Sequence, residues 1–179
     1  MNEEIVVQDM EKSLKLVETQ IKPIVKNLLS GWELETVEGN DNKICKILDM
    51  LCGVDYFLMS PKVSVVYGVA SRVQYEKNYR TFTVRKSRES GALTEYEKRN
   101  QAIMLGGLYP AYTMQAYVLK DKVQGLALTK TVNLIDFIKK GYAEENRTNT
   151  EKIGQADFYV CKWDKMRYCG YEVREYKNK

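Results

Sequence analysis

The segment that decides the fold reads GVDYFLMSPKVSVVYGVASRVQYEKNYRTFTVRKSRESG and covers residues 53–91. β-Branched and aromatic residues dominate three runs within it, at 54–59, 63–76 and 79–86. Short runs of this composition, bounded by turn-forming residues, are typical of β-strands. We therefore predict three strands, with the third run as the antiparallel neighbour of the second through a turn at Lys77-Asn78.

The rest of the chain alternates helical and extended patterns. Apolar residues recur at helical spacing over 3–29, and shorter helices are predicted at 42–52, 93–105 and 133–142. Further strands are predicted at 32–37, 112–119 and 126–132 and in the C-terminal segment 156–179, whereas 143–155 lacks an apolar period. We expect Asn133 to cap the last helix. In helix 42–52 the side chains expected to face inward are Ile44, Ile47, Leu48 and Leu51.

This order predicts an α+β protein of mixed α/β character, with a single central mixed β-sheet flanked by helices and a nuclease-like core. A chain of 179 residues has the length of one domain. We assign 1–179 to a single domain, in which 1–142 forms the core, 143–155 an exposed loop and 156–179 a C-terminal strand extension.

Composition limits the location and the chemistry. No apolar run reaches the roughly 20 residues that span a bilayer, and MNEEIVVQDMEK lacks the order of a secretion signal, so we expect a cytoplasmic protein with no membrane partner. The chain contains no histidine, which excludes histidine bases and histidine-ligated metals. The four cysteines lack the spacing of zinc pairs. Catalysis would need carboxylates, lysine, tyrosine or an oxygen-bound metal such as Mg²⁺.

Polar side chains interrupt two of the predicted strands. Asp55 lies on an apolar run, where burial is costly unless the acid is paired or binds a cation, although it could also cap the preceding turn. Arg72 and Gln74 share one face of the next strand with Ala70. The guanidinium of Arg72 matches two phosphate oxygens, and it could equally form a structural salt bridge with Asp55.

A basic stripe follows these strands. Its members are Arg80, Arg85, Lys86 and Arg88, and Lys98 and Arg99 on the next predicted helix could extend it. Such a patch would bind nucleic acid in a salt-dependent way. The alternative is a solvated charged face, because glutamates are interspersed with the basic residues and the net charge is only +4.

Three stretches resemble the restriction-endonuclease-like superfamily, also called PD-(D/E)XK: KICKILDMLCGVDYFLM, the strand ending in VASRVQ, and TVNLIDFIKKG. The resemblance covers residues 1–142 and implies a helix–strand–strand–strand–helix–strand core. It also implies that Asp55 holds a catalytic metal and that the next strand presents an acid and a lysine. That triplet is Ala70-Ser71-Arg72 here, so the second acid and the lysine are missing. Another acid would have to replace the missing ligand, from Glu18, Glu33 or Glu35.

The degenerate triplet leaves two functions open. The first is a DNA- or RNA-binding protein of a phage or mobile element, with weak, relocated or lost Mg²⁺-dependent phosphodiesterase activity. In its active form Asp55 would hold the metal, Gln74 would orient a ligand or water, and Arg72 would stabilise phosphate charge. The predicted nucleic-acid contacts are Arg80, Arg85, Lys86, Arg88 and Arg99. Mg²⁺ and the absence of any cofactor are equal alternatives. The second function is a non-enzymatic, anti-CRISPR-like phage inhibitor that binds a host nuclease complex.

Overall fold

The computed structural model describes residues 15–37, 42–87, 91–147 and 156–178. Its larger sheet has six strands in the order β1-β2-β3-β5-β6-β9. β3 and β5 run parallel, and every other neighbouring pair in this sheet is antiparallel. The strands are β1 (Glu33–Thr36), β2 (Tyr56–Met59), β3 (Val66–Gln74), β5 (Tyr112–Leu119), β6 (Lys122–Lys130) and β9 (Arg174–Lys177).

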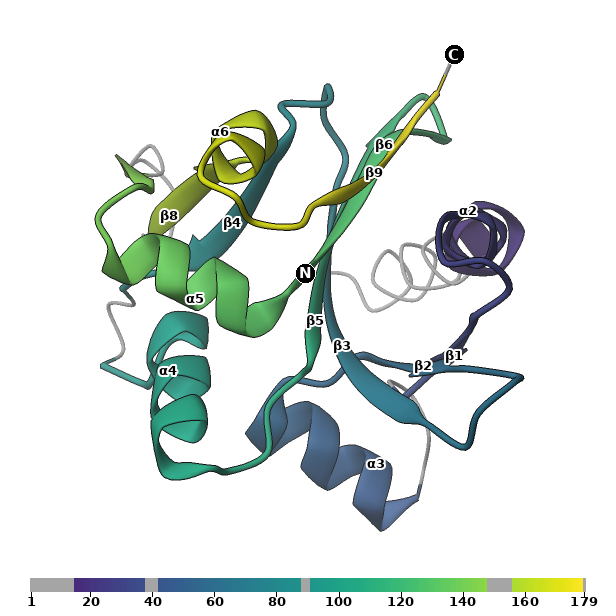
Figure 1. The fold of residues 1–179 in the computed structure, drawn as a ribbon, viewed down its shortest axis with the longest axis horizontal. Helices are drawn as coiled ribbons and strands as arrows, with labels where there is room; N and C mark the ends of the chain where they lie inside the picture. The colour runs from purple at the N-terminus through teal and green to yellow at the C-terminus, as the bar shows by residue number, and fades with distance from the viewer. Residues whose placement is uncertain (1–14, 38–41, 88–90, 148–155, 179) are drawn as a thin grey trace, which may run out of the picture.

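A second, antiparallel sheet has the order β4-β8-β7, formed by β4 (Thr81–Arg85), β8 (Asp157–Lys162) and β7 (Glu144–Arg147). The helices are α2 (Lys22–Leu28), α3 (Lys43–Ile47), α4 (Glu95–Leu105), α5 (Thr131–Lys139) and α6 (Trp163–Tyr168). A π-helical turn, η1 (Val17–Ile21), precedes α2, and another, η2 (Leu48–Cys52), follows α3. Figure 1 shows α2 on one side of the larger sheet, and α4, α5, α6 and the smaller sheet on the other side. None of the helices described is long and apolar enough to cross a membrane.

The pleat of β5 divides the interior into two hydrophobic cores. Met114, Ala116 and Val118 alternate along β5 and pack with η1, α2 and the inner face of β2. Tyr117 points to the opposite face, where it packs with residues of β4, α5 and α6, including Trp163. Because successive side chains of a strand point to opposite faces, one strand serves both cores. β5 is therefore the central element that joins the two halves of the structure.

The predicted α+β class with a central mixed sheet flanked by helices is confirmed. The helix predicted over 93–105 is also present as α4, and its start has a capping box between Thr94 and Glu97. Gly106 ends this helix in the left-handed conformation, with φ of 66°. Glycine adopts this conformation without a steric penalty.

The predicted pairing of run 79–86 with run 63–76 was wrong. β4 pairs with β8 in the smaller sheet, and β5 lies beside β3. Six consecutive residues of β5 are buried, so this strand needs cover on both faces and takes the central position. The chain leaves the larger sheet at Arg80, which has φ of 55°. Hydrogen bonds from the Arg80 side chain to Asp164 and Glu175 fix the position of the chain at this point.

Three smaller predictions also need correction. α5 begins at Thr131 without a side-chain cap, so Asn133 lies inside the helix. Residues 144–147 form the edge strand β7, because backbone pairing with β8 needs no apolar period. The inward orientation predicted for α3 and η2 is wrong for Ile44 and Leu51, whose exposed fractions are 66% and 68%. Ile47 is also exposed. Residues 148–155 lie outside the part of the chain that the structure describes.

Candidate functional site

Polar side chains gather where β2, β3 and β5 face the smaller sheet. In the register of β3 with β5, Arg72 lies beside Gln115, and Gln74 lies beside Tyr117. The alternation of a strand therefore places Arg72 and Gln74 on one face, as predicted. Asp55 immediately precedes β2, and its N–H donates to the Val69 carbonyl at 2.9 Å. This backbone contact fixes Asp55 next to β3.

The carboxylate of Asp55 is held by the backbone of the degenerate triplet. Its Oδ2 accepts a hydrogen bond from the Ser71 N–H at 2.5 Å. The hydroxyl oxygen of Ser71 is buried and has no hydrogen-bond partner among the residues described. In the register of β3 with β5, Ser71 lies beside Met114, so its hydroxyl is on the face opposite to Arg72.

A cavity of about 160 Å³ opens at this point. We call it the phosphate cavity, because the guanidinium groups of Arg72 and Arg99 in its lining offer paired N–H donors of the kind that match phosphate oxygens. It is lined by Gly53, Asp55, Ala70, Ser71, Arg72, Thr83, Glu95, Arg99, Thr113, Met114 and Gln115. The lining comes from β3, β4, β5, α4 and the segment before β2, so the α4 crossover is what brings these groups together.

Arg72 forms an ion pair with a glutamate that the sequence did not single out. Its Nη2 lies 2.6 Å from Glu95 Oε1, and both side chains are largely buried. Burial acts to raise the pKa of the Glu95 carboxyl, but the charges of Arg72 and Arg99 and a hydrogen bond from the Arg85 N–H outweigh it. The pKa of Glu95 therefore lies below its ordinary value, and the group is ionised at neutral pH.

Arg99 lies one helical turn after Glu95. Burial lowers the pKa of Arg99, and the charges of Glu95 and Asp55 act against this shift. A guanidinium nevertheless remains protonated in proteins. Arg99 takes part in none of the ion pairs found among the described residues, so its hydrogen-bonding capacity toward an acidic group is unused.

Three arginines act on the carboxylate of Glu95. Three guanidinium groups, those of Arg72, Arg99 and Arg85, act on Glu95. Asp55 and Glu95 are the carboxylates in the cavity lining. Arg72 and Arg99 are the arginines in that lining, so its two positive charges match its two carboxylates. Because Arg99 takes part in none of the ion pairs among the described residues, its N–H donors can bind an anion with several oxygen acceptors.

A larger cleft of about 510 Å³ continues from the phosphate cavity, with which it shares Arg72 and Thr83. Its other lining residues are Gln74, Glu76, Tyr79, Thr81, Tyr117, Asn146, Phe158, Val160 and Lys162. Gln115 lies at the junction: its Nε2 donates to Gln74 Oε1 at 2.9 Å, and its Oε1 accepts from the Thr83 hydroxyl at 3.3 Å. The two cavities are therefore adjacent, and residues of both sheets line each of them.

The side chains present do not fit a Mg²⁺ centre. Among the described residues, no group of three or more His, Cys, Asp or Glu side chains could hold a metal ion. Asp55 accepts from Ser71, and Glu95 is bound by Arg72. Mg²⁺ needs oxygen ligands in near-octahedral geometry, and adjacent guanidinium groups oppose its binding. The acids considered as substitute ligands pair elsewhere: Glu18 and Glu35 with Lys22, and Glu33 with Lys26.

The basic stripe does not form one surface. Arg80 donates to Asp164 and Glu175. Burial acts to raise the pKa of Glu175, but the hydrogen bonds from Arg80 and Arg167 outweigh it, so this pKa lies below its ordinary value. Lys86 pairs with Glu145. Arg85 lies over the ring of Phe158 at 5.7 Å, next to the phosphate cavity. Arg99 lines that cavity, whereas Arg88 lies outside the described residues.

Sequence reasoning missed Glu95 and Gln115 as members of the site. Glu95 is one of the glutamates interspersed with the basic residues, and Glu95 and Arg99 have the spacing of neighbours on one helical face. Gln115 is the one amide within the otherwise apolar run YTMQAYVL, and it is buried. A buried polar side chain in a central strand indicates a specific partner.

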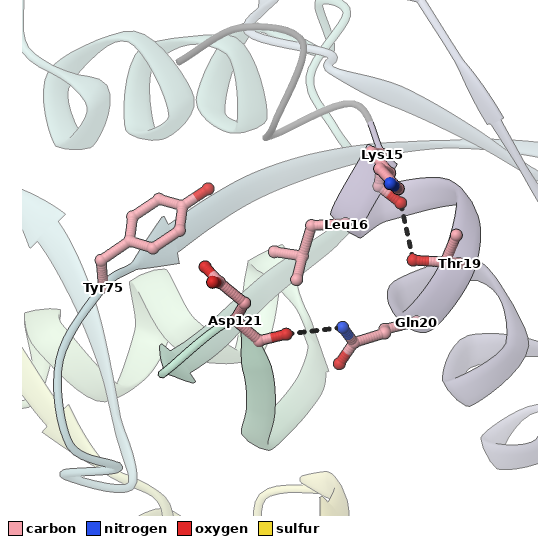
Figure 2. Close-up of a pocket in the computed structure, with 6 residues that line it drawn as sticks. All are labelled: Lys15, Leu16, Thr19, Gln20, Tyr75 and Asp121. Atoms are coloured by element: carbon pink, nitrogen blue, oxygen red, sulfur yellow. Dashed lines mark hydrogen bonds between the residues drawn. The ribbon is translucent and has the colours of Figure 1, made fainter. Parts of the chain in front are cut away.

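A separate cavity of about 290 Å³ lies between η1 and the β5–β6 turn. Figure 2 shows Gln20 donating to the Asp121 carbonyl and Thr19 donating to the Lys15 carbonyl. Gln20 also accepts from the Val123 N–H. These contacts attach the N-terminal helix to the larger sheet, so we assign this cavity to the packing of the fold.

Comparison with known proteins yields no relative: no family model matches the chain, and no curated protein or solved structure matches it.

Proposed function

We propose that this chain binds DNA or RNA through a nuclease-like core in which the cavity beside Asp55 binds a backbone phosphate and holds no catalytic metal. The observation that carries the proposal is Arg99, an arginine that lines the cavity and takes part in none of the ion pairs among the described residues. In this account the phosphodiesterase activity implied by the resemblance is lost. The nucleic acid is bound and is not cleaved.

The order of elements supports the nuclease-like part of the proposal. α2, β1, β2, β3, α4 and β5 follow one another as the resemblance implies, with α3 and β4 as additions. β1, β2, β3 and β5 are also consecutive neighbours in the larger sheet. Asp55 and the triplet at Ala70 to Arg72 lie side by side, because Asp55 bonds to the Ser71 N–H.

The chemistry of the cavity favours phosphate as the ligand. A guanidinium offers paired N–H donors that match two phosphate oxygens. Asp55 and Glu95 keep Arg72 and Arg99 in position and moderate their mutual repulsion.

We expect Arg99→Gln to weaken the binding of a 20-nucleotide single strand by on the order of tenfold at low salt, with a salt slope reduced by about one. The measurement is fluorescence anisotropy across a series of salt concentrations. Arg174→Gln is the matched control, because Arg174 is an exposed arginine of β9 that pairs with Glu172, away from the cavity. Equal effects of the two substitutions would contradict the proposal.

A second candidate function is the non-enzymatic inhibitor that binds a host nuclease complex. The observation that favours it is the set of exposed apolar side chains on α3, η2 and the end of α4: Ile44, Met50, Leu51, Met104 and Leu105. Exposed apolar groups of this size often mark protein contacts. Tight binding to a nuclease complex by a variant that lacks both Asp55 and Arg99 would favour this function over nucleic-acid binding.

A further inference from the structure

We infer that the larger cleft receives an unpaired base of the bound nucleic acid, which makes the ligand single-stranded at this site. The inference rests on the proposed function, because it places the base next to a phosphate held in the phosphate cavity. It adds a second subsite and a ligand class to that function.

The two cavities are arranged for one nucleotide. They share Arg72 and Thr83 in their linings, so the two cavities are adjacent. The cleft volume of about 510 Å³ lies in the range of small-molecule sites and accommodates a purine or pyrimidine ring. A phosphate at Arg72 would leave its base directed along β3 toward Gln74.

Aromatic rings line the cleft. Tyr79 is 51% exposed, and its ring meets that of the buried Tyr117 edge-on, with centroids 6.1 Å apart. Phe158 lines the cleft from β8, with Arg72 over its ring at 5.0 Å. Bases stack on aromatic rings, and arginine planes contribute to the same kind of contact. The exposed part of Tyr79 is therefore a stacking surface for a base at the edge of the cleft.

Hydrogen-bonding side chains line the same cleft as these rings. Gln74 accepts from Gln115 through Oε1, and its Nε2 donates to none of the described residues. Glu76 and Asn146 also line the cleft and are exposed. Amide and carboxylate groups recognise the edges of bases through hydrogen bonds. The carboxylate of Glu76 repels a phosphate group. This part of the cleft therefore favours a base over the sugar-phosphate backbone of the nucleic acid.

A duplex does not present such a ligand. Its bases are paired and stacked on both faces, so a ring can enter a cleft between two sheets only after it leaves the stack. Moving a base out of a duplex breaks its pairing and stacking, which costs free energy. The cleft therefore selects single-stranded DNA or RNA over duplexes of the same sequence.

The test uses three probes of equal length: a mixed-sequence single strand, the same strand composed of abasic nucleotides, and the matching duplex. The abasic strand keeps every phosphate and removes every base. We expect the base-containing strand to bind on the order of tenfold more tightly than the abasic strand. Tyr79→Ala should remove that difference. Tyr168→Ala is the matched control, because Tyr168 is 92% exposed on α6 and does not line the cleft.

The outcomes separate this inference from the proposed function. If the abasic strand and the duplex bind as tightly as the base-containing strand while Arg99→Gln weakens all three, the base subsite is refuted and phosphate binding stands. A base preference that Tyr79→Ala leaves intact also refutes the assignment of the subsite to this cleft. If no probe binds at low salt, the proposed function itself fails. Thermal unfolding of each variant verifies that the fold is retained.

Discussion

Trp163→Ala is expected to lower the free energy of unfolding by about 4 kcal/mol, the largest stability effect that we predict. Trp163 is fully buried at the start of α6, and its ring lies 5.7 Å from that of Phe82 and 6.0 Å from that of Tyr117. It therefore packs against both sheets. Its Nε1 has no hydrogen-bond partner among the described residues, so the expected loss comes from apolar contacts and the cavity left behind.

Urea unfolding followed by circular dichroism measures this effect. The matched control is Trp32→Ala, because Trp32 is only partly buried and stacks on one ring, that of Tyr67. We expect the control to lose less than half as much stability as Trp163→Ala. Equal losses would show that the two sheets are not joined through Trp163.

Arg72→Gln is expected to lower the free energy of unfolding by about 3 kcal/mol at pH 7. The substitution removes the ion-pair partner of Glu95 and leaves a largely buried carboxylate without it. The pKa of Glu95 in the wild-type protein lies below its ordinary value, as burial is outweighed by the neighbouring arginines. The pair therefore stabilises the fold above the pKa of the unfolded state, and this contribution is lost as the pH falls through the pKa of the folded state.

The stability gap between Arg72→Gln and the wild type should consequently narrow as the pH falls below the ordinary glutamate pKa of 4.5. Urea unfolding at a series of pH values measures this gap. The double variant Arg72→Gln, Glu95→Gln should regain part of the stability at pH 7, because it removes the unpaired charge. A gap that stays constant with pH would contradict the assigned role of the ion pair.

Local sequence patterns predicted where the strands lie better than they predicted which strands pair. The β-branched runs indicated β2, β3 and β4, because strand composition is a local property. The partner of β4 depends on β8, which lies more than 70 residues later in the chain. No local pattern of 79–86 distinguishes pairing with β8 from pairing with β3.

Only the part of the site that depends on local sequence patterns could be predicted. Period-two alternation was sufficient to place Arg72 and Gln74 on one face, and the resemblance placed Asp55 beside them. The contribution of Glu95 depends on the α4 crossover, which returns the chain to the same face of the sheet. The ion pair of Arg72 with Glu95, which decides whether the cavity suits a cation or an anion, arises only from this tertiary arrangement.

The affinity of Asp55→Asn for a single-stranded oligonucleotide, measured in the presence of EDTA, tests the central claim most directly. The asparagine oxygen can still accept the hydrogen bond from the Ser71 N–H, while the negative charge is removed. A phosphate site should then bind about fivefold more tightly, because roughly 1 kcal/mol of repulsion is lost. Weaker binding of Asp55→Asn, together with wild-type binding that EDTA abolishes, would contradict the account and identify Asp55 as a metal ligand.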